Sequence, residues 1–79
     1  MPTLFIEGPY RVYFTSHDRG EPPHVHVEQD GIRAKIWLKP ISVASNGGLS
    51  QRDLNKVLEI IRRRRTECLE KWNEYFGKN

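Results

Sequence analysis

The chain has 79 residues, enough for one small domain with a single hydrophobic core, and we assign residues 1–79 to that domain. Thirteen basic and ten acidic residues give a net charge of +3 at pH 7, a bias toward anionic partners that is too mild to decide a function. No apolar run approaches about 18 residues, which excludes a transmembrane helix, and the N-terminus lacks a basic region followed by a long apolar stretch, so we expect neither a secretory signal nor a membrane partner.

Two short strand patterns open the chain. Residues 4–7 are mostly apolar and are followed by Gly8-Pro9, which predicts an edge strand. Residues 10–15 alternate, with one side formed by Tyr10, Val12 and Phe14. The polar residues 16–21, which include a glycine, are expected to form a connecting loop.

A β-hairpin is the clearest element of the sequence. Asp30-Gly31 tolerates the positive φ angles of a type I′ turn. Folding about this turn pairs Val27 with Ala34, Val25 with Ile36, and His24 with Trp37. Because side chains alternate along a strand, one face is apolar: Val25, Val27, Ala34, Ile36 and Leu38. The opposite face carries His24, His26, Glu28, Arg33, Lys35 and Trp37.

The rest of the chain predicts a short strand and then a helix. Pro40 ends the hairpin, and residues 41–43 are consistent with a further short strand. Ser50 can cap a helix, with Asp53 at the N3 position, and we expect one helix to about Phe76. The predicted fold is therefore α+β: a three- to four-stranded antiparallel sheet with one long C-terminal helix packed on one face, which leaves the other face open.

The expected length of this helix raises a packing problem. About 26 helical residues span roughly 39 Å, whereas a seven-residue strand spans roughly 24 Å. The helix must therefore break near its arginine run, where the sequence has no Gly or Pro, or its aromatic half must find another surface. We expect self-association as a homodimer through Leu69, Trp72, Tyr75 and Phe76. The alternative is that the N-terminal strand covers these side chains within one chain.

Arginine and cysteine side chains of this helix are interpreted mainly as structural. The run 62–65 spreads around the helix circumference, so we interpret most of it as a solvated face. Arg65 lies within the apolar stripe and requires a partner or an exit to water. Cys68 shares that stripe and is expected to be a buried small hydrophobe. As the single cysteine it cannot form an internal disulfide, which fits a cytoplasmic protein.

Four segments carry a resemblance to a known family. They are FTSHD at 14–18, PPHVHVE at 22–28, AKIWL at 34–38 and WNE at 72–74. In these segments the chain resembles a small uncharacterised prokaryotic family, domain of unknown function 4160, over nearly its whole length. Members are often encoded beside another small domain, so the resemblance implies one half of a toxin–antitoxin-like pair. It provides no catalytic residues to transfer.

The histidine pair admits three interpretations. His24 and His26 project the same way from a strand and could chelate a transition metal if His17 or Glu28 supplied a third ligand. Adjacent Lys35 would repel a cation, and no cysteine pair is nearby, so we assign no metal or other cofactor. The same histidines could cleave RNA as acid and base, although the sequence indicates no substrate cleft. They could also be structural, with His24 packed against Trp37, so we name no catalytic residue.

The open sheet face is the predicted binding site. It interleaves basic and aromatic residues: Arg11, Tyr13, His24, His26, Arg33, Lys35 and Trp37. Exposed sheet aromatics can stack nucleobases while cations hold phosphates, which favours RNA or DNA. Trp, Tyr and Arg also anchor protein interfaces. We expect a small interaction protein that binds a partner encoded nearby and, through the same face, nucleic acid; a ribonuclease or a His-based metal-binding domain is the alternative.

Overall fold

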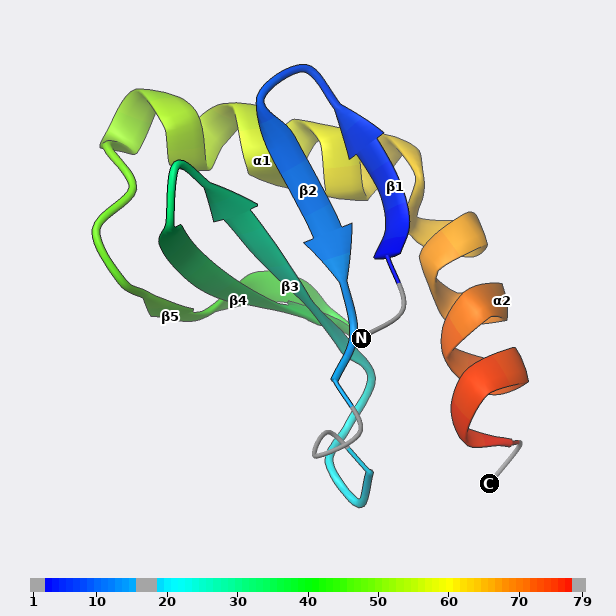
Figure 1. Cartoon of the computed structure of the whole chain (residues 1–79). Helices are drawn as coiled ribbons and strands as arrows, with labels where there is room; N and C mark the ends of the chain where they lie inside the picture. Colours follow the sequence, from blue (N-terminus) through cyan, green and yellow to red (C-terminus); the bar gives the residue numbers. More distant parts are fainter. Residues whose placement is uncertain (1–2, 16–18, 78–79) are drawn as a thin grey trace.

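Five strands and two helices follow one another in the computed structural model, which describes residues 3–15 and 19–77 (Figure 1). The strands are β1 (Thr3–Glu7), β2 (Tyr10–Tyr13), β3 (His24–Gln29), β4 (Ile32–Leu38) and β5 (Ile41–Asn46), and the helices are α1 (Gln51–Arg63) and α2 (Arg65–Phe76). The strands form one antiparallel sheet in chain order. The α+β class is confirmed. In the described part of the chain, no helix is both long and apolar enough to cross a membrane.

The predicted strand count was too low. The segment predicted as a short strand at 41–43 extends through Asn46 and pairs with β4 along Ala34 to Leu38. Its serines and alanine are weak strand formers, so the sequence alone indicated only its apolar start. Pairing with a central strand supplies the backbone hydrogen bonds that local propensity does not favour.

The predicted hairpin is confirmed in register and turn. Val25 pairs with Ile36, Val27 with Ala34, and His24 with Trp37. Positive φ angles of 50° and 80° at Asp30 and Gly31 fit a type I′ turn. This register sends the apolar side chains to one face of the sheet and the polar and aromatic ones to the other.

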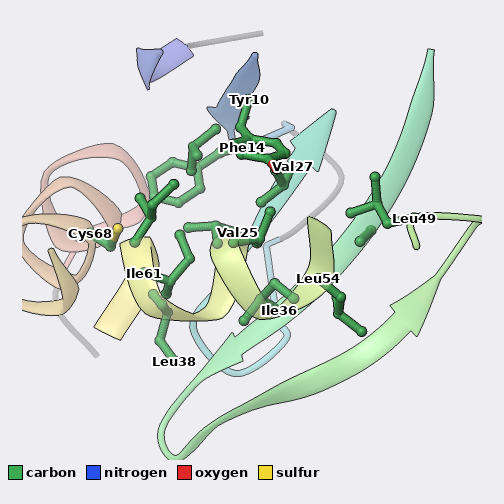
Figure 2. Packing of buried hydrophobic residues seen from close by; sticks show 14 of the residues in the cluster. Tyr10, Phe14, Val25, Val27, Ile36, Leu38, Leu49, Leu54, Ile61 and Cys68 are labelled. Carbon is green, nitrogen blue, oxygen red and sulfur yellow. The ribbon is translucent and has the colours of Figure 1, made fainter. Parts of the chain in front are cut away.

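Helix α1 packs on the apolar face and closes the core. Figure 2 shows Val25, Val27 and Ile36 of the sheet facing Leu54 and Ile61 of α1. Ser50 caps this helix as predicted, because its Oγ accepts a hydrogen bond from the Asp53 backbone N–H at 3.1 Å. The Asp53 carboxylate also accepts a hydrogen bond from the Tyr10 hydroxyl at 2.7 Å, which joins the start of α1 to β2.

The prediction of one long helix is wrong, because the helix breaks at Arg64. This residue has φ −109° and ψ 22°, and α2 begins directly after it. Its guanidinium donates to Glu7 of β1 at 3.1 Å and to Glu67 at 2.9 Å, and it lies 3.5 Å from the centroid of the Phe5 ring. Hydrogen bonding to Glu67 is the main cause of a raised Arg64 pKa. Tertiary contacts therefore hold the break without Gly or Pro.

Helix α2 leaves the line of α1 and descends beside the end of the sheet (Figure 1). Arg65 finds the partner that the sequence required, since its Nε donates to the Leu38 carbonyl at 2.9 Å. Trp72 packs edge-on against Phe14, with ring centroids 5.2 Å apart, and is only 6% exposed. A buried Trp72 is not available as a dimer anchor.

The other proposed dimer residues have mixed environments. Leu69 and Phe76 are partly buried against the core, whereas the Tyr75 side chain is 45% exposed. Leu4 of β1 and Tyr75 line the same cavity, so the N-terminal strand lies beside the aromatic half of the helix and leaves Tyr75 exposed. Self-association through the remaining exposed surface stays a prediction.

We predict that Gly31→Ala lowers the free energy of unfolding by about 1–2 kcal/mol, because an L-residue is disfavoured at this φ. An added Cβ would meet no heavy atom within 4 Å, so backbone strain is the only cost. Asp30→Asn should be nearly neutral, since Asn also tolerates positive φ. Urea denaturation measures both variants. Equal stability of Gly31→Ala and the parent protein would contradict the turn.

Candidate functional site

The outer face of the sheet is the face opposite α1, and strand pairing arranges its side chains in three rows. The rows are Ile6, Arg11, Glu28 and Arg33; Tyr13, His26 and Lys35; and His24 and Trp37. All seven residues predicted for the site lie on this face, and His24 is next to Trp37 as expected. Their role in binding remains a prediction.

Carboxylates hold the cations of the outer face. Glu28 accepts from Arg11 at 3.0 Å and lies 3.6 Å from Arg33, so one carboxylate serves two guanidinium groups. Lys35 pairs with Glu21, a loop residue that the sequence analysis did not assign to the site. The three cations and the two carboxylates in these ion pairs together carry a net charge of +1. The field available to attract phosphate is therefore weak.

Aromatic rings form a continuous line across the outer face. Tyr13 stacks on His26 with centroids 5.3 Å apart, and His26 meets His24 edge-on at 5.1 Å. His24 in turn lies 5.5 Å from Trp37 and 5.1 Å from Trp72 of α2. These contacts fix the ring positions, and they connect the sheet to the aromatic half of the helix.

Cations cover two of the rings. The Arg11 guanidinium lies 4.4 Å from the centroid of Tyr13, and the Lys35 ammonium lies 4.7 Å from that of Trp37. Tyr13 is only 3% exposed, so its ring does not offer the open stacking platform that the sequence suggested. Trp37 is half-buried and retains an accessible part.

His24 is fully buried, which limits its chemistry. Its Nδ1 lies 2.9 Å from the Pro22 carbonyl oxygen; because a carbonyl only accepts, Nδ1 carries the hydrogen. Burial beneath Trp72 and Trp37 keeps a phosphodiester from this ring. The arrangement favours the structural interpretation of His24, and Trp72 is the covering residue that the sequence could not place.

Metal ligation finds no support among the described side chains. Within residues 3–15 and 19–77, no group of three His, Cys, Asp or Glu side chains is placed to hold an ion. His17, one of the third ligands considered from the sequence, lies outside the described residues. The other, Glu28, is already engaged by Arg11 and Arg33.

Comparison with known proteins identifies the family. A family model described as a domain of unknown function, DUF4160, matches residues 10–73. The chain belongs to this family. The matched range begins at β2 and includes the hairpin, α1 and most of α2, so the helix break of this DUF4160 protein and every outer-face residue except Ile6 fall inside it. Neither the curated proteins nor the solved structures give a match.

Cys68, the single cysteine of this DUF4160 protein, lies on the buried side of α2 and has no exposed surface. Burial raises the pKa of its thiol to about 11. The thiolate is the reactive form of cysteine, so a raised pKa makes a nucleophilic role unfavourable. The expectation of a small buried hydrophobe is confirmed.

The raised Cys68 pKa predicts a pH dependence of stability. In the unfolded chain the thiol titrates near about 8.5, so above that pH the unfolded state loses a proton that the folded state keeps. The neutral thiol therefore makes its full contribution to the free energy of unfolding below about pH 8.5. That contribution decreases as the pH rises toward the pKa of the folded protein, by about 3 kcal/mol at most. The advantage of the parent protein over Cys68→Ala should therefore shrink between pH 8 and 10.5 in urea denaturation. Lysines and tyrosines titrate in both proteins, so their effects cancel in the difference between the two free energies of unfolding. If that difference stayed constant from pH 8 to 10.5, it would contradict the raised Cys68 pKa.

Proposed function

We propose that this protein is a binding domain whose outer face docks a partner protein, as one member of a toxin–antitoxin-like pair in the cytoplasm. The partner is the product of a neighbouring gene, as the family resemblance implies. The supporting observation is the set of cations and rings that strand pairing and ion pairs hold in fixed positions on the outer face. Fixed side chains lose little conformational entropy when a partner binds.

Side-chain chemistry on this face resembles that of protein interfaces. Arg33 is 66% exposed at its side chain, the Ile6 side chain projects beside Arg11 and is 67% exposed, and Trp37 is half-buried. Arginine and tryptophan are among the residues that supply most binding energy at protein interfaces. The partner that fits best presents a carboxylate toward Arg33 and an apolar surface toward Ile6 and Trp37.

Nucleic acid is the weaker candidate ligand. Glu21 and Glu28 each neutralise a cation, and Tyr13 is buried, so both phosphate binding and base stacking are reduced. The ribonuclease alternative also loses support, because His24 is buried and its Nδ1–H is committed to Pro22. A metal-binding function gains no support from the described side chains.

Calorimetric titration with the purified product of the adjacent gene tests the proposal. We expect Trp37→Ala and Arg33→Glu each to weaken binding at least about tenfold, because each removes an anchoring side chain from one of the two outer rows of the face. Lys56→Glu, which makes the same kind of charge reversal on an exposed position of α1, should leave the affinity unchanged. Equal affinities for all variants would place the interface elsewhere.

A second titration tests nucleic acid directly, with a single-stranded uridine 12-mer as the probe. With one effective positive charge, a plot of log affinity against log salt concentration should have a slope of about −0.7. Binding should be too weak to measure at about 0.15 M salt. Tight binding at that salt, lost in Lys35→Glu, would instead identify the outer face as a nucleic-acid site.

A further inference from the structure

A groove separates β1 from α2, and none of the residues in the three rows of the outer face lines it. Figure 1 shows α2 standing beside the free edge of β1. Between them is a cavity of about 340 Å³, lined by Thr3, Leu4, Phe14, Lys71, Glu74 and Tyr75. The groove therefore combines a strand on one wall and a helix on the other.

The strand wall offers unpaired backbone. β1 is the first strand of the sheet and pairs with β2 alone among the described strands. The outer edge of such a strand presents N–H and C=O groups that an incoming extended chain can pair with. Addition of a strand to a free edge is a recurrent way in which folded domains bind peptides. A small molecule would leave most of this edge unused, which favours an extended chain as the occupant.

The floor and rim of the cavity suit one large apolar side chain. Phe14 and Leu4 form apolar lining, and Tyr75 stands at the rim with 45% of its surface exposed. The Phe14 ring packs against Trp72 and Phe76, with centroids 5.2 and 5.8 Å away, and these contacts restrict its movement. A volume of about 340 Å³ lies at the low end of ligand cavities, which favours a single side chain over a larger ligand.

The helix wall adds charge. Lys71 and Glu74 are both exposed and lie one turn apart on α2. Within residues 3–15 and 19–77 neither side chain forms an ion pair. They can therefore receive one acidic and one basic side chain from a chain that runs along the groove.

We propose that this groove binds an extended segment of another protein, which adds a strand to the free edge of β1 and places one aromatic or branched aliphatic side chain in the cavity. The groove adjoins the outer face, because the Thr3 Oγ1 accepts a hydrogen bond from Arg11 at 3.2 Å, but none of the residues in the three rows lines its cavity. A protein with both sites can hold the folded body of a partner and an extended tail at the same time.

Selection of phage-displayed random heptapeptides on the intact protein tests the proposal. Enriched peptides should share one central aromatic or branched aliphatic residue and lack proline beside it, because proline cannot donate to a strand ladder. Synthetic copies should bind at least about tenfold more weakly to Tyr75→Ala and to Lys71→Glu than to the parent protein. Lys56→Glu, the matched charge reversal at an exposed position of α1, should bind the peptides as the parent protein does. Circular dichroism establishes that each variant is folded.

Amide hydrogen exchange distinguishes strand addition from side-chain docking alone. Bound peptide should slow the exchange of β1 amides on the free edge while β5 amides are unchanged. The proposal is overturned if no peptide is enriched, if enriched peptides bind Tyr75→Ala and Lys71→Glu as tightly as the parent, or if β1 exchange is unaffected. It is also overturned if sedimentation shows a dimer that Tyr75→Ala dissociates and peptide does not, since a second copy would then be the occupant.

Discussion

Arg64 lies where the C-terminal helix changes direction, and its guanidinium is held by Glu7 of β1 and Glu67 of α2 while covering the ring of Phe5. A continuous helix would carry the aromatic half past the end of a sheet whose strands are at most seven residues long. The break instead turns α2 toward the end of β2 and the start of β3. Burial of Trp72, closure of the apolar core at Cys68 and the formation of a groove beside β1 all depend on that turn.

The same turn of the helix determines the environment of His24. Trp72 reaches His24 from α2, and Trp37 reaches it from β4, so the His24 ring is enclosed at the point where sheet and helix meet. Enclosure favours a structural role for His24. In the proposed function the outer face binds through its shape and through cations that Glu28 and Glu21 keep in place.

The sequence predicted the hairpin to the residue, because alternation over two strands and the Asp30-Gly31 turn independently require the same register. It also identified the helix cap at Ser50, whose signal is local. The helix break could not be predicted in this way, since Arg64 is held by Glu7, a residue 57 positions away. Burial of Tyr13 and the pairing of Lys35 with Glu21 likewise depend on tertiary contacts, so the sequence placed these residues on the correct face and overestimated how open that face is.

The contact between Trp72 and His24 is the most direct measure of this account, because it exists only if the helix turns at Arg64. Cross-relaxation between ring protons, measured by NMR on the free protein, reports it. The account predicts cross-peaks from the Trp72 indole to the rings of both His24 and Phe14, whose centroids lie 5.1 and 5.2 Å away. It also predicts that helical contacts between successive turns are interrupted at Arg64. Uninterrupted helical contacts through Arg64, with no cross-peak between Trp72 and His24, would contradict the account and would leave the histidine pair accessible for chemistry.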